Sequence, residues 1–223
     1  MIDFARVRRM MVDNQLRTYD ITDLAVLAAM NDTPREVFVP DELKMLAYSD
    51  QPIVVARTKD DGTRALLPPM IFGRLVQNLG VETGDRALVV ASGLGYEAVV
   101  LARLGARVTI LESDPGIAES TRHVLAPFAD SGIEIVTGPL AEGHADGAPY
   151  DIILINGAIS VRPEKLLDQL RDGGRLGTIV GDGSRTSRAT LFVRSGAVSG
   201  SRALFDAAAP SLPAFENKPG FVF

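Results

Sequence analysis

Residues 87–96, ALVVASGLGY, constrain the fold of this chain more than any other stretch. An apolar run as long as a buried strand passes directly into a turn with glycines at 93 and 95. A strand, a glycine turn and a helix put backbone N–H groups at the carboxyl edge of a sheet, where open α/β folds bind ligands. The stretch therefore predicts an α/β fold with a ligand site at this turn.

Strand and helix patterns alternate after this turn. We expect strands at 86–91, 107–111, 133–136, 150–155 and 175–180, and helices at 96–104, 115–126 and 162–172. Nearly continuous apolar strands are typical of a parallel sheet that helices cover on both faces. The pattern predicts a doubly wound, mostly parallel sheet. Asn156 and Gly157, directly after one of these strands, favour a turn.

The two ends of the chain add further elements. Asp3 and Thr22 are expected to cap two amino-terminal helices, residues 50–68 to form a hairpin or surface loop, and 70–79 a helix. An antiparallel carboxy-terminal hairpin is expected at 189–194 and 201–205. We expect one domain over 1–223, made of amino-terminal helices with a substrate-side loop (1–80), a cofactor-binding core (81–183), and a hairpin with a tail (184–223). The apolar end, 221–223, either docks on the sheet edge or marks a self-association surface.

Composition limits the partners of the chain. Its net charge of −5 gives no basic field that would hold nucleic acid. The absence of cysteine and the presence of only two histidines argue against a metal site. No apolar run approaches the roughly 18 residues of a membrane span, and the start lacks the core of a secretory signal. We expect a cytoplasmic protein without nucleic-acid or membrane partners, as a monomer or a homodimer.

Glu112 gives the turn an acidic partner. It stands 17 positions after Gly95, close to the spacing at which a carboxylate accepts hydrogen bonds from ribose hydroxyls. Residues 93–98 satisfy the fingerprint of an NAD-dependent oxidoreductase, whereas a turn that begins at Ala91 matches a methyltransferase loop. About eighty residues precede the strand, which favours the second interpretation. A tight turn without any ligand is a third.

Several separated segments resemble the protein-L-isoaspartate O-methyltransferase family. They are PREVFVP at 34–40, AYSD at 47–50, GLGY at 93–96, and LLDQL at 166–170 followed by GGRL at 173–176. The resemblance covers residues 5–180. It implies a seven-stranded, Rossmann-like methyltransferase sheet with S-adenosylmethionine as cofactor. The implied activity is transfer of a methyl group to the α-carboxyl of an isoaspartyl residue in a damaged protein.

The resemblance also implies two groups of site residues. The cofactor-binding group is Ala91, Ser92, Gly93, Gly95, Tyr96, Glu112, Ser113, Pro139 and Leu140. The substrate-side group is Arg64, Leu67, Pro69 and Asn156.

Four positions depart from the family's pattern. Leu67 stands where a family serine approaches the substrate, and leucine donates no hydrogen bond, so no catalytic residue is assigned. Val89, Ala91 and Pro139 stand where the family has an acidic residue, a glycine and an aspartate. Losing two or three hydrogen bonds of about 1 kcal/mol each would weaken cofactor binding roughly ten- to a hundredfold. An inactive binding protein on the same fold therefore stays an alternative, beside the oxidoreductase.

Overall fold

The structure, a computed structural model, describes residues 2–58, 61–181 and 187–216. The predicted boundary at 183–184 and the predicted docking of residues 221–223 lie outside the described residues.

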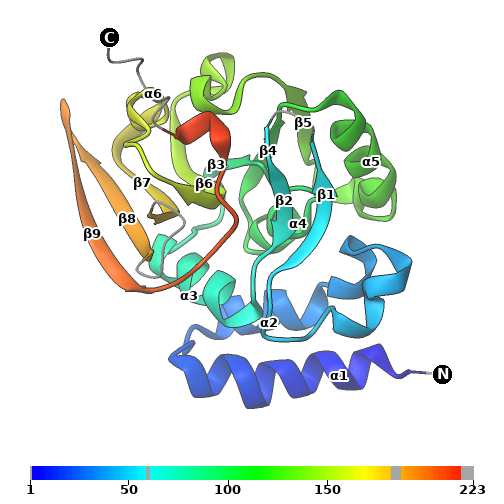
Figure 1. Cartoon of the computed structure of the whole chain (residues 1–223). Helices are drawn as coiled ribbons and strands as arrows, with labels where there is room; N and C mark the ends of the chain where they lie inside the picture. The colour runs from blue at the N-terminus through cyan, green and yellow to red at the C-terminus, as the bar shows by residue number, and fades with distance from the viewer. Residues whose placement is uncertain (1, 59–60, 182–186, 217–223) are drawn as a thin grey trace, which may run out of the picture.

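A seven-stranded sheet forms the centre of the molecule (Figure 1). In spatial order its strands are β5 (Glu134–Thr137), β4 (Arg107–Glu112), β3 (Arg86–Val90), β6 (Tyr150–Ile159), β7 (Leu170–Val180), β8 (Arg188–Ser195) and β9 (Val198–Asp206). The first five are parallel, whereas β8 and β9 pair antiparallel at the edge. The predicted doubly wound sheet with an antiparallel carboxy-terminal hairpin is confirmed. Because β3 lies between β4 and β6, the strand order reverses at β3, where such sheets bind ligands.

Helices pack around the sheet, and the amino-terminal helices lie beside it. The α-helices are α1 (Phe4–Met11), α2 (Leu24–Asp32), α3 (Pro69–Leu79), α4 (Tyr96–Arg103), α5 (Pro115–Leu125) and α6 (Glu164–Asp168). Short helical segments are η1 (Val12–Leu16), η2 (Arg17–Tyr19), η3 (Arg35–Phe38), η4 (Asp41–Leu46), η5 (Ala126–Ser131), η6 (Leu140–Glu142), η7 (Ala145–Gly147) and η8 (Pro213–Phe215). Figure 1 shows α1 and α2 below the sheet, with α2 in contact with α3 and α4.

The caps of the first two helices follow from side-chain oxygens that accept backbone N–H bonds. Asp3 accepts from the backbone of Arg6 at 3.0 Å, as predicted. The second cap is Asp23 rather than Thr22, because Asp23 immediately precedes the helix and accepts from Ala25 and Val26. Thr22 instead donates its N–H to Gln77 on α3.

The predicted helix at 162–172 is too long. The α6 helix ends at Asp168, and β7 already begins at Leu170, which pairs with Tyr150 of β6. The sequence LLDQL has apolar residues at helical spacing, but pairing with β6 takes its last leucine into the sheet. Tertiary pairing has overridden the local periodicity here.

The predicted turn at Asn156 and Gly157 is wrong. Both residues lie inside β6, between Leu154 and Ala158, where the register with β7 shifts. Such a bulge inserts unpaired residues into a strand and redirects their side chains. Asn156 is consequently buried, and its side-chain amide donates to the carbonyl of Ala65 at 3.0 Å.

Residues 50–68 contain a separate hairpin of β1 (Ile53–Arg57) and β2 (Thr63–Leu66). The β2 strand contacts β6 of the central sheet. This β1–β2 hairpin connects the amino-terminal helices to α3 (Figure 1), and Val55 and Arg64 place it beside the ends of β3 and β4.

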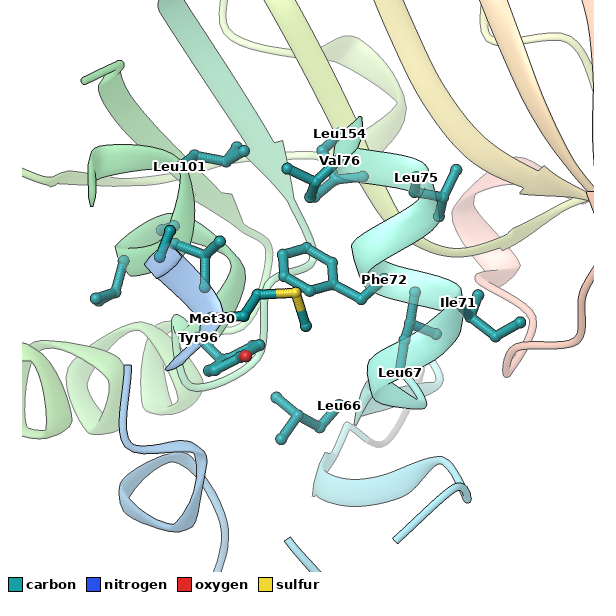
Figure 2. Packing of buried hydrophobic residues seen from close by; sticks show 14 of the residues in the cluster. Met30, Leu66, Leu67, Ile71, Phe72, Leu75, Val76, Tyr96, Leu101 and Leu154 are labelled. Atoms are coloured by element: carbon teal, nitrogen blue, oxygen red, sulfur yellow. The ribbon is translucent and has the colours of Figure 1, made fainter. Parts of the chain in front are cut away.

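Phe72 on α3 lies in the core that joins the amino-terminal helices to the sheet. Its side chain is fully buried and points toward Met30 and Tyr96 (Figure 2), with ring centroids of Phe72 and Tyr96 5.5 Å apart. Leu66 and Leu67 from the end of the hairpin lie in the same cluster. The hairpin and the sheet thus share one hydrophobic core.

Replacing this ring should destabilise the whole fold. We expect Phe72→Ala to lower the free energy of unfolding by about 3–5 kcal/mol, through lost burial and a residual cavity. Urea denaturation followed by circular dichroism measures the change. Leu24→Ala, at a side chain that is 71% exposed, is the control and should change stability by less than about 0.5 kcal/mol. A loss below about 1 kcal/mol for Phe72→Ala would contradict this account of the core.

Candidate cofactor and substrate site

The turn after β3 keeps the backbone of a glycine-rich loop although one glycine is missing. The φ angles of Ala91, Gly93 and Gly95 are 60°, 61° and 94°, all in the region that glycine adopts most readily. Ala91 holds this conformation with a side chain, and its N–H donates to Leu111 of β4 at 3.0 Å. Gly95 is the N-cap residue of α4, which begins at Tyr96. The turn therefore presents the conformation expected of a ligand-binding loop.

Glu112 lies at the end of β4 and is almost completely buried. Its Oε1 accepts from the backbone N–H groups of Ser113 and Asp114, at 2.8 and 3.2 Å. Arg64 of β2 approaches both carboxylate oxygens, with Nε 2.9 Å from Oε2 and Nη2 2.7 Å from Oε1. The carboxylate is thus held by one guanidinium and two backbone donors.

Arg64 is fully buried and is surrounded by acceptors. Besides Glu112, its Nη2 donates to Asp61 Oδ2 at 3.0 Å and to Ser113 Oγ at 2.9 Å, while Nη1 donates to the carbonyl of Asp61 at 2.8 Å. Burial lowers the pKa of Arg64, but Glu112 and Asp61 outweigh burial and raise it overall. The side chain therefore remains a cation that pairs with two carboxylates.

The β1–β2 hairpin rests directly on the glycine turn. A Cβ atom built on Gly93 would lie 2.8 Å from Val55 Cγ2 and 3.2 Å from Arg64 Cβ. A separation of 2.8 Å is closer than two carbon atoms can pack. The space over Gly93 is filled by the chain itself.

The loop after β5 reaches the same edge of the sheet. The N–H of Gly138 donates to the carbonyl of Glu112 at 3.0 Å, which brings the following Pro139 close to the end of β4. Leu140 is buried in a cluster with Leu111 and Ala91. The three predicted cofactor segments, the turn, Glu112 with Ser113, and Pro139 with Leu140, therefore meet at one sheet edge.

Tyr96 and Ser92 point into the protein beneath the turn. The Tyr96 ring packs against Phe38 and Phe72, and the guanidinium of Arg35 lies 4.8 Å from its centroid. Ser92 Oγ donates to Glu97 Oε2 at 3.0 Å. Tyr96 therefore shapes the interior under the turn rather than its outer surface.

Glu97 is a buried carboxylate that the sequence analysis missed. Burial raises its pKa to about 7, although a backbone hydrogen bond, the Ser92 hydroxyl and the charge of Arg35 act in the opposite direction. Arg35 is also fully buried, and burial lowers its pKa. The available signal was one acid inside the otherwise apolar run YEAVVLA.

The predicted substrate-side residues fix the hairpin and α3 in place. Leu67 is buried, and its carbonyl accepts from Arg35 Nη2. Pro69 is the first residue of α3 and is buried. The amide of Asn156 donates to the carbonyls of Ala65 and Ala91, at 3.0 and 3.4 Å, and so ties the hairpin to the turn. Arg64, predicted on this side, instead pairs with Glu112.

In this conformation the site does not fit S-adenosylmethionine. Both oxygens of Glu112 are engaged by Arg64, and the hairpin occupies the space over Gly93. A groove of about 770 Å³ passes beside the turn at Val55 and Leu94, but residues of α5, η3 and η4 form its other walls. The predicted cofactor segments lie together, and residues of the hairpin cover Gly93 and Glu112.

Comparison with known proteins decides the family. The model of the family "Protein-L-isoaspartate(D-aspartate) O-methyltransferase (PCMT)" matches residues 6–203. A protein-L-isoaspartate O-methyltransferase of Methanoculleus marisnigri is 37% identical over 193 residues, which cover 86% of each chain. This chain belongs to the protein-L-isoaspartate O-methyltransferase family. The resemblance found in the sequence is confirmed, and with it the enzyme class and the S-adenosylmethionine cofactor of the family.

Solved structures of this family share the fold. A structure named protein-L-isoaspartate O-methyltransferase superposes with a TM-score of 0.77 at 21% identity and covers 92% of this chain, which spans 64% of that chain. A Plasmodium falciparum protein assigned to the same family, in complex with S-adenosyl-L-homocysteine, gives 0.77 at 18% identity, covering 93% and 98%. Family and fold together favour the predicted methyltransferase over the oxidoreductase and the inactive binding protein.

Among the described residues, no helix combines the length and the apolar character that crossing a membrane requires.

The raised pKa of Glu97 predicts a pH-dependent stability. Its folded pKa of about 7 exceeds its ordinary value of 4.5, so the folded state holds the proton more tightly. Stability is therefore lost as the pH rises from 4.5 through 7. Glu97→Gln removes this loss and should be more stable than the parent protein at pH 8 by roughly 3 kcal/mol, with little difference near pH 4.5.

Urea denaturation across this pH range measures the difference. Glu119→Gln, at a side chain that is 77% exposed, is the matched control and should follow the parent protein at every pH. A Glu97→Gln difference that does not change with pH would show that the carboxylate does not titrate in this window.

Proposed function

We propose that this chain is an S-adenosylmethionine-dependent protein-L-isoaspartate O-methyltransferase. Its product is a methyl ester on the carboxyl of an isoaspartyl residue in a damaged protein. The observation that carries this function is the meeting of the glycine turn, Glu112 and the 138–140 loop at one sheet edge, in a chain of this family. S-adenosylmethionine supplies the methyl group.

We assign the cofactor side of the site to the turn and to its two neighbouring loops. These residues are Ala91, Ser92, Gly93, Gly95, Glu112, Ser113, Pro139 and Leu140. Backbone N–H groups at such a turn hold polar groups of a ligand, and a carboxylate at the end of the next strand accepts from ribose hydroxyls. Tyr96 supports the turn from below, because its ring packs in the core.

The substrate side requires no general base from the protein. An isoaspartyl carboxyl is already ionised at neutral pH, so the acceptor releases no proton when it is methylated. The protein then has to position the acceptor and exclude water. Leu67 and Pro69 are buried and hold the hairpin and α3 in place. We assign them the positioning of the hairpin beside the acceptor, a role that needs no hydroxyl at position 67.

We further propose that the protein acts in the cytoplasm on protein or peptide acceptors, as a monomer or a homodimer. The absence of cysteine suits a reducing compartment, and the acidic net charge suits acceptors other than nucleic acid.

A paired-peptide assay tests the proposed activity. The full chain is incubated with S-adenosylmethionine and either an isoaspartyl peptide or the same peptide with ordinary aspartate. Methyl ester is measured as the methanol that base hydrolysis releases from it. We expect ester on the isoaspartyl peptide alone, because only its side chain presents the α-carboxyl for methylation.

Two variants make this assay specific for the site. Glu112→Gln should lower the methylation rate by roughly tenfold or more, since a charged hydrogen-bond acceptor for the ligand is lost. Glu119→Gln, exposed on the neighbouring α5, should leave the rate unchanged. Equal modification of both peptides, or no ester from the folded protein, would refute the proposed function.

A further inference from the structure

Arg64 and Glu112 form the most deeply buried ion pair among the described residues, with side chains 0% and 1% exposed. The carboxylate in this pair is the one that the proposed site assigns to the ribose hydroxyls of the cofactor. Its two oxygens already accept three hydrogen bonds at 2.9 Å or less, from Arg64 Nε, Arg64 Nη2 and the N–H of Ser113. With Arg64 in place the Glu112 side chain is only 1% exposed, so a ribose has no access to this carboxylate.

We propose that Arg64 is an internal competitor of the cofactor, and that S-adenosylmethionine binds only when the guanidinium leaves Glu112. This inference rests on the proposed function for the identity of the ligand. The β1–β2 hairpin carries the competitor: Arg64 lies on β2, and Val55 on β1 covers Gly93 of the turn. Departure of Arg64 from Glu112 and exposure of the turn therefore require movement of the same hairpin.

Asp61 makes this movement energetically accessible. Removing one partner from a buried ion pair is strongly destabilising, because an uncompensated charge remains. Arg64 has a second carboxylate three residues away on its own hairpin, with Nη2 3.0 Å from Asp61 Oδ2. Asp61 is 24% exposed, in contrast to Glu112. The guanidinium can therefore leave Glu112 without losing its countercharge.

Glu112 likewise keeps partners after the exchange. The backbone N–H groups of Ser113 and Asp114 belong to its own loop and remain within 2.8 and 3.2 Å of Oε1. The hydroxyls of a ribose would then replace the N–H donors of Arg64. The two arrangements satisfy the same carboxylate with different donors, which is the property of a two-state element.

The competition lowers the apparent affinity for the cofactor. When only a fraction of molecules has the site open, the measured dissociation constant is the intrinsic one divided by that fraction. A side chain at position 64 that cannot form the ion pair raises the open fraction. Arg64→Gln should therefore bind the cofactor product more tightly than the parent protein.

Calorimetric titration with S-adenosyl-L-homocysteine, without any peptide, tests this expectation. Arg64→Gln should bind roughly tenfold more tightly or better than the parent protein, which corresponds to about 1.4 kcal/mol. Arg57→Gln is the matched control, because Arg57 is an exposed arginine on the same hairpin, and its affinity should stay within about twofold of the parent protein. Equal or weaker binding by Arg64→Gln, or no binding by either protein, overturns the proposal.

A measurement on the parent protein covers the case in which Arg64→Gln fails to fold. Arg64 and Arg35 each have a buried Nε–H, bonded to Glu112 and to the carbonyl of Ala47 respectively. Hydrogen exchange of these two protons is followed by NMR during titration with S-adenosyl-L-homocysteine. We expect exchange at Arg64 to accelerate roughly tenfold or more at saturation, while Arg35 is unchanged. Continued protection of Arg64 at saturation, or no saturation of the folded parent protein in the millimolar range, overturns the proposal.

These results are separable from the assay of the proposed function. A tighter complex with Arg64→Gln supports the competition whether or not an isoaspartyl peptide is methylated. If the parent protein methylates the peptide and Arg64→Gln binds the cofactor product with unchanged affinity, the proposed function is supported and the proposed competition is refuted.

Discussion

The burial of the Glu112 carboxylate at the end of β4 is the constraint on which the site depends. A charge removed from water must be paired and hydrogen-bonded within the protein. The chain meets this requirement with two backbone N–H groups and with Arg64, a residue 48 positions earlier. Because Arg64 belongs to β2, satisfying Glu112 determines where the hairpin lies. The hairpin in turn covers the glycine turn, so the pairing of one carboxylate decides which groups of the site are accessible.

A second buried carboxylate lies on the other side of the turn and is treated differently. Glu97 receives a hydroxyl from Ser92, and its Oε1 has no hydrogen-bond partner among the described residues. Its pKa is accordingly raised to about 7 by burial. The nearby cation, Arg35, donates instead to the carbonyls of Ala47 and Leu67. The turn is therefore flanked by one carboxylate that a guanidinium pairs directly and by one that has an oxygen without a hydrogen bond.

Apolar periodicity in the sequence was sufficient to predict the elements that depend on it directly. The apolar run before Gly93 predicted β3 to within one residue, because a buried parallel strand requires continuous apolar side chains. The extent of α6 and the bulge at Asn156 could not be predicted in this way, since both are set by pairing of β6 with β7. The contact of Arg64 with Glu112 is equally invisible to periodicity. The resemblance assigns Arg64 to the substrate side, and the structure adds that its guanidinium pairs with Glu112 of the cofactor group.

At two of the positions that depart from the family's pattern, Ala91 and Leu67, the backbone carbonyl is hydrogen-bonded within the chain. Ala91 keeps the backbone conformation of the turn and offers its carbonyl to Asn156, which also holds Ala65 of the hairpin. The carbonyl of Leu67 is bound by Arg35, and Arg64 is bound by Glu112. Polar groups at positions that the family resemblance assigns to the ligand site are thus hydrogen-bonded to other residues of the chain. Lost ligand contacts alone would determine the affinity only if the site were an open pocket that differed in its lining residues. In a site that the protein fills itself, affinity for a ligand depends equally on the contacts that the ligand has to displace.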